Sequence, residues 1–68
     1  MTIDIKLISQ LSTDQRAIFD TRFSRLQALN AQDGNSVSVE EIDGEEKIVY
    51  RNSRSEFISS EPLQVLID

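Results

Sequence analysis

The sequence predicts an α+β fold in which a long helix in the N-terminal half packs on a β-hairpin, followed by a short second helix, with extended apolar segments at both ends. Three observations predict it: a capped helical stretch, a hairpin signal directly after it, and alternating apolar residues near both ends. We expect the 68 residues to form a single small domain.

Residues 1–10 alternate between apolar and polar side chains, with Ile3, Ile5 and Leu7 as the apolar members. This period is typical of a half-buried strand. Three interpretations stay open: an edge strand that pairs with the hairpin, an arm that adds a strand to a neighbouring chain, or a segment that joins the following helix.

Residues 12–33 predict a helix. Ser12 and Gln15 have the spacing of a capping box, and Gly34 lies just beyond the expected end. Side chains at helical spacing form one face that is suited to cover the hairpin. They are Phe19, Phe23, Leu26 and Asn30, widened by Ile18 and Leu29.

The opposite side of this helix carries small residues, namely Ala17, Thr21, Ser24, Ala28 and Ala31. They suit either a solvent-exposed face or the close approach of a second helix. Arg22 and Arg25 flank the apolar face, and two readings of them stay open. Their alkyl stems lie along the core edge with the guanidinium groups in water, or they meet acidic residues of another subunit, such as the hairpin tip.

Residues 36–51 predict a hairpin with Asp43-Gly44 as its two-residue turn, because both central positions of a type I′ turn need positive φ. The register then pairs Ile42 with Glu45, Glu40 with Lys47, Val39 with Ile48, and Val37 with Tyr50. The apolar pairs share one face, and Glu40 and Lys47 form an opposite-charge pair on the other. A lone hairpin is marginal in water, so the helix must cover its apolar face.

Residues 53–60 predict a short second helix, capped by Asn52 or Ser53, that buries Phe57 and Ile58. The helix must stop there, since a residue that precedes proline avoids helical geometry.

Residues 62–68 predict an extended tail in which Leu63, Val65 and Ile67 alternate with their neighbours. This run needs an apolar partner, either the domain's own sheet or another chain.

The composition excludes several function classes. A net charge of -5 argues against binding to nucleic acid or to an anionic membrane surface. The chain has no cysteine and no histidine, which removes thiolate metal sites and the commonest general base. Neither a leader segment nor a membrane span is visible, so we expect a cytoplasmic protein.

Acidic residues cluster around the hairpin tip, but their spacing is not that of a calcium loop, and a two-residue turn cannot wrap a cation. These residues are Glu40, Glu41, Asp43, Glu45 and Glu46. The serines have no base to activate them. We therefore expect no metal, no cofactor and no catalytic residues.

The stretch 12–60 resembles the gpW-like head-completion (head–tail joining) proteins of tailed phages. The matching positions are Val37, Val39, Asp43, Gly44, Ile48, Val49, Tyr50, Arg51 and Ser53. The resemblance implies a ring-forming subunit of the virion neck, between portal and tail, that assembles in the host cytoplasm. It implies partners that are copies of the chain and neighbouring neck, portal or tail subunits.

The leading hypothesis is therefore a non-enzymatic structural subunit that completes its fold in a homo-oligomer, most specifically a phage head–tail connector. Its candidate interface residues are Ile3, Ile5, Leu7, Arg22, Arg25, Glu45, Glu46, Leu63, Val65 and Ile67. The alternative is a small acidic phage-encoded inhibitor or regulator that binds a basic surface of a host protein through the hairpin tip.

Overall fold

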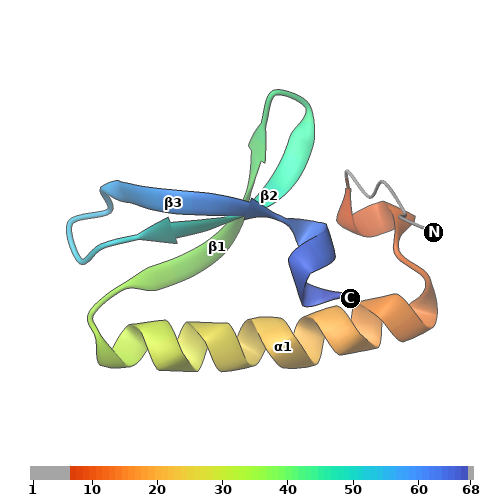
Figure 1. Ribbon diagram of the computed structural model, residues 1–68, viewed down its shortest axis with the longest axis horizontal. Coiled ribbons are helices and arrows are strands. Elements are labelled where there is room, and N and C mark those ends of the chain that lie inside the picture. The colour runs from red at the N-terminus through yellow and green to blue at the C-terminus, as the bar shows by residue number, and fades with distance from the viewer. Residues whose placement is uncertain (1–6, 68) are drawn as a thin grey trace.

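A computed structural model describes residues 7–67 and shows an α+β fold: one long helix, a three-stranded antiparallel sheet and two short 3-10 helices (Figure 1). In chain order the elements are η1 (Ile8–Gln10), α1 (Thr13–Gln32), β1 (Ser36–Ile42), β2 (Glu45–Arg51), β3 (Phe57–Pro62) and η2 (Leu63–Leu66). The strand order in the sheet is β1-β2-β3, the same as the order along the chain.

The caps of α1 are those that the sequence predicts. The Ser12 side chain accepts a hydrogen bond from the backbone N–H of Gln15, over 3.2 Å. The Gln15 side chain in turn accepts from the backbone N–H of Ser12, over 3.0 Å. At the other end Gly34 adopts φ +79°, and its N–H donates to the carbonyl of Ala31. A residue with a side chain is strained at such φ, so the glycine ends the helix here.

The first hairpin, β1–β2, is confirmed in turn and register. Asp43 and Gly44 adopt φ of 54° and 81°, as a type I′ turn requires. The four predicted cross-strand pairs are all present. The apolar face of this hairpin faces α1, and the opposite, outer face carries Glu40, Lys47 and Arg51.

The expected short helix over 53–60 is wrong, because this segment turns back and forms β3. Asn52 accepts hydrogen bonds through Oδ1 from the backbone N–H of Arg54 and of Glu56. Ser55 donates to the carbonyl of Asn52 and adopts φ 63°. This is a three-residue hairpin loop, a tight turn followed by one left-handed residue. The side-chain bonds of Asn52 are the same kind that cap a helix, which is why the sequence pattern pointed to one.

The expected extended tail over 62–68 is also wrong within the described residues. After Pro62 the chain forms η2, and residues three apart in a 3-10 helix lie on the same side. Leu63 and Leu66 therefore point together into the core, where they are 0% and 7% exposed.

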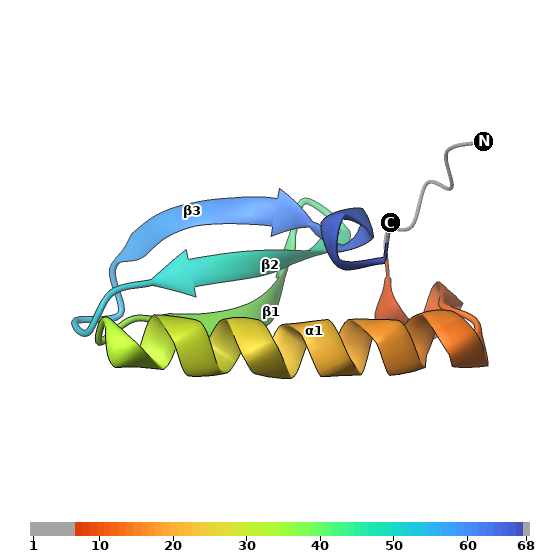
Figure 2. The same ribbon diagram turned by 60° about the horizontal axis from the view of Figure 1, so that its bottom comes forward.

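The core lies between α1 and the sheet, with η2 inserted at one end (Figure 2). Helix α1 packs along β1, and η2 contacts both α1 and β2. The fully or nearly buried core cluster is Phe19, Val37, Ile48, Leu63 and Leu66.

The strand or arm expected over residues 1–10 is a 3-10 helix at Ile8–Gln10, where Ile8 packs against the core. The rest of that prediction, including Ile3 and Ile5, lies outside the described residues.

The outward-facing backbone groups differ between the two edge strands, β1 and β3. On β1 the carbonyl of Val37 accepts a hydrogen bond from the side chain of Gln27 on α1, over 3.2 Å. On β3 the register directs the backbone groups of Ser60 and Pro62 away from β2, because the direction alternates along an antiparallel ladder. Pro62 has no N–H to offer there, and a bulge interrupts the strand beside Phe57 and Ile58.

Candidate interaction surfaces

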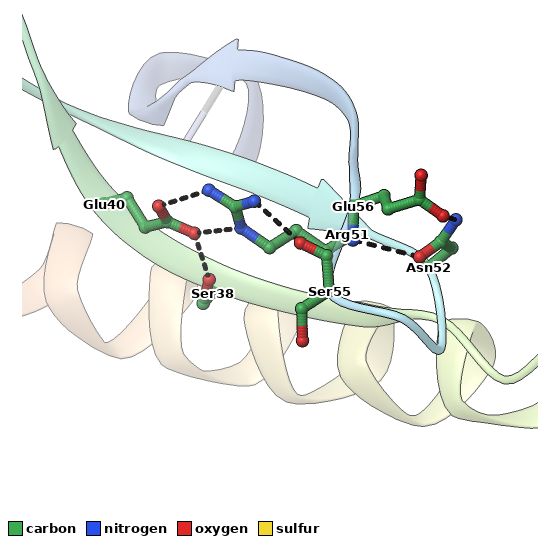
Figure 3. A network of polar contacts seen from close by, with 6 residues as sticks. All are labelled: Ser38, Glu40, Arg51, Asn52, Ser55 and Glu56. Atoms are coloured by element: carbon green, nitrogen blue, oxygen red, sulfur yellow. Dashed lines mark hydrogen bonds and ion pairs between the residues drawn. The ribbon is translucent and has the colours of Figure 1, made fainter.

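A polar network crosses the outer face of the sheet and ends in the β2–β3 loop (Figure 3). Arg51 donates from Nε and Nη2 to the two carboxylate oxygens of Glu40, over 2.8 and 2.9 Å. Its Nη1 donates to the carbonyl of Ser55, and the hydroxyl of Ser38 donates to Glu40. Lys47 stands opposite Glu40 as predicted, but the ion pair forms with Arg51 instead.

The network is a structural element of the sheet. The hydrogen bond from Arg51 lowers the pKa of Glu40, an effect partly opposed by burial. Val49 lies between Glu40 and Arg51 on the same face and is 0% exposed, although it lies away from α1. The donors and acceptors of the network thus satisfy each other on the face that carries Val49.

The residues that the structure describes show no chemical site. Over residues 7–67 there is no group of three potential metal-ligating side chains. Within the same residues every buried side-chain nitrogen and oxygen has a hydrogen-bond partner. None of the described helices combines the length and the apolar character needed to cross a membrane.

Tyr50 lies on the inner face of the sheet, and its side chain extends from β2 toward β3. Its hydroxyl donates to Glu61, over 3.0 Å. Burial raises the pKa of Tyr50, and the hydrogen bond to the Glu61 carboxylate raises it further. This pair ties β2 to β3 on the same face of the sheet as the core.

The acidic hairpin tip is only partly free in the described chain. Glu46 accepts a hydrogen bond from the backbone N–H of Ile8, over 3.4 Å, so it ties η1 to β2. Glu45 is half-buried, whereas Glu41 and Asp43 are exposed.

The candidate interface residues that are described have different locations. Leu63 is a core residue, which corrects its placement in an extended arm. Leu7 is half-buried, and Ile67 packs against the core. Val65 is 47% exposed. Arg22 donates to the carbonyl of Leu66, over 3.0 Å, and thereby ties η2 to α1. Both Arg22 and Arg25 are exposed.

One exposed surface runs along α1. Ile18 and Leu29 were expected to widen the core face but are 40% and 52% exposed. Together with the two arginines they form one line on the helix at spacings of 4, 3 and 4 residues. We call this line the helix row: Ile18, Arg22, Arg25 and Leu29. A shallow hollow lies beside it, lined by Ala17, Ile18, Thr21 and Arg22.

A second exposed surface lies on β3 and was missed by the sequence reasoning. Phe57 and Ile58 were expected inside a short helix but are 56% and 49% exposed. Both fall at the bulge opposite Arg51, which interrupts the alternation of a strand. The acidic residue Glu56 precedes them, and we call Glu56, Phe57 and Ile58 the β3 patch. Glu61 pairs with Ile48 and so lies on the inner face of the sheet, away from Phe57. The signal that favours a strand is that a residue before proline prefers extended geometry.

No protein-family model, no curated protein and no solved structure matches the chain.

Proposed function

We propose that the chain is a non-enzymatic structural subunit that binds other protein subunits, including copies of itself, in a larger assembly. The observation that carries the proposal is the presence of two separate exposed apolar surfaces, the helix row and the β3 patch, on one small domain. Contiguous apolar side chains at the surface, such as Phe57 and Ile58, mark protein interaction sites more often than scattered ones do. Head-to-tail assembly requires two different surfaces of this kind on each subunit.

The specific form of this proposal is the head–tail connector of a tailed phage, located in the virion neck after assembly in the host cytoplasm. The hairpin residues from Val37 to Arg51, which carry the resemblance, support it through their turn and register. β3 stands where the resemblance implies a second helix, so the support comes from the hairpin.

The alternative, an acidic inhibitor that docks its hairpin tip on a basic host surface, has the net charge of -5 in its favour. It has less support from the tip itself, since Glu46 is hydrogen-bonded within the chain. Exchanging Glu41 for lysine reverses an exposed charge at the tip without changing the turn residues, and it tests this alternative directly.

The deciding experiment is the solution mass of the purified chain by light scattering over a concentration series. We expect the mass to rise with concentration toward a defined oligomer. A mass that stays at one chain at every concentration, up to the millimolar range, overturns self-assembly as the function.

A further inference from the structure

The helix row combines apolar and charged side chains along one side of α1, as one side of a protein–protein interface does. Ile18 and Leu29 are eleven residues apart, which is about 16 Å at 1.5 Å per residue, and they lie on the same side of α1. Between them the row carries only Arg22 and Arg25. The row therefore offers two apolar contacts with positive charge between them.

The four residues of the helix row are exposed to solvent. α1 packs along β1, while β3 lies at the far edge of the sheet (Figures 1 and 2). The hollow beside Ile18 and Thr21 is open to solvent on this helix. An incoming side chain thus reaches the row without displacing any element of the fold.

The β3 patch has the opposite charge. Phe57 and Ile58 are adjacent and both exposed, and the preceding residue is Glu56. The Glu56 carboxylate accepts from the side chain of Asn52. This neutral donor positions the carboxylate and leaves its negative charge in place.

Packing two identical surfaces together, row on row or patch on patch, brings like charges close to each other. Two helix rows packed antiparallel, with Ile18 on Leu29, place Arg22 against Arg25 of the other copy. Two β3 patches bring the Glu56 carboxylates of both copies together. Packing a row on a patch instead places apolar side chains on apolar side chains and arginine beside glutamate, which is the complementary arrangement.

We infer that the helix row of one copy binds the β3 patch of a second copy, with Phe57 and Ile58 seated against Leu29 and with Arg25 facing Glu56. This inference rests on the proposed function and names the contact by which the subunits assemble. The two surfaces share no residue, so each copy presents both a donor surface and an acceptor surface.

The test uses one variant for each surface and a matched control. Leu29→Asp removes the row, Ile58→Asp removes the patch, and Ala28→Asp places the same charge on an exposed neighbour of Leu29 that faces another side of α1. We expect Leu29→Asp and Ile58→Asp each to weaken self-association at least about tenfold, and Ala28→Asp to leave it near wild type.

Mixing the two variants is the decisive step. Each retains the surface that the other lacks, so an equimolar mixture is expected to form a one-to-one dimer that neither variant forms alone. A mixture that stays monomeric overturns the inference. Wild-type self-association that neither variant weakens also overturns it, while leaving the proposed function intact. A monomeric wild type removes the proposed function itself.

A charge exchange tests the same contact without substituting an apolar residue. Arg25→Glu and Glu56→Lys are each expected to weaken association, and their mixture to restore it. Glu56→Lys preserves the loop, because Asn52 holds it through hydrogen bonds to backbone N–H groups. Glu41→Lys makes the same charge change at an exposed position on the hairpin and serves as the control. Equal effects of Glu41→Lys and Glu56→Lys reduce the result to net charge and contradict the contact.

Discussion

Arg51 binds both carboxylate oxygens of Glu40, over 2.8 and 2.9 Å, although Lys47 is the residue directly opposite Glu40 in the ladder. The longer reach is favoured because a guanidinium presents two parallel donors to a carboxylate, whereas an ammonium acts as a point charge. The contact joins β1 to β2 on the face that carries the buried Val49.

Exchanging Glu40 for glutamine is expected to lower stability near neutral pH but not in acid. The pKa of Glu40 is lower in the folded chain than in the unfolded chain, so its contribution is present above the unfolded value near 4.5. The contribution is lost as the pH falls through the lower folded pKa. Urea denaturation of both proteins between pH 7 and pH 2 measures this, with Glu41→Gln as the exposed control. Midpoints that differ equally at all pH values contradict the assignment.

The hydroxyl of Tyr50 is expected to ionise above the pH at which an exposed tyrosine does. Burial is the larger cause of the raised pKa, and the Glu61 carboxylate is the second. Glu61→Gln should therefore bring the titration midpoint part of the way back, but not to that of a free tyrosine. Ultraviolet absorbance of the phenolate reports this directly, since Tyr50 is the only tyrosine in the chain. A full return to the free value shows that burial has no part in the shift.

Ser55→Gly is expected to stabilise the fold by about 1 kcal/mol, because a side chain at left-handed φ carries a steric cost that glycine avoids. Ser55 adopts φ 63° in the β2–β3 loop. The control is Ser53→Gly, in the same loop without positive φ, where added freedom of the unfolded chain should give a small loss. The free energy of unfolding from denaturant titration compares the two. A loss at both positions rules out the left-handed loop residue.

Leu63→Ala is expected to cost about 2–5 kcal/mol, since it opens a cavity in the core. Leu63 is 0% exposed in η2, whereas Val65 in the same helix is 47% exposed. Val65→Ala should therefore change the free energy of unfolding by no more than about 0.5 kcal/mol. Equal small effects at both positions are the result expected of an extended tail, and they exclude the buried 3-10 helix.

Sequence reasoning predicted those parts of the fold in which a short sequence pattern is compatible with only one local hydrogen-bonded structure. Asp43-Gly44 allows little besides a type I′ turn, and this fixed the register of β1 with β2. Ser12 and Gln15 satisfy each other's backbone groups, and this set the start of α1.

The parts that it missed depend on contacts between segments far apart in the chain. Asn52 makes the same local hydrogen bonds in a turn as at a helix start, so only pairing with β2 decides between the two. The bulge removed the alternation that marks a strand at Phe57 and Ile58. Their surface therefore had no sequence signal, and neither did the exposure of Ile18 and Leu29, which depends on how α1 sits on β1.

The treatment of the two sheet edges has a consequence for aggregation. The side chain of Gln27 occupies the carbonyl of Val37 on one edge, and Pro62 withholds a donor on the other. These two contacts shorten the run of backbone groups on which another chain could extend the sheet, so the folded state offers a poorer template for cross-β stacking. A subunit built in this way is expected to resist fibril growth at high local concentration better than one with two unblocked edges.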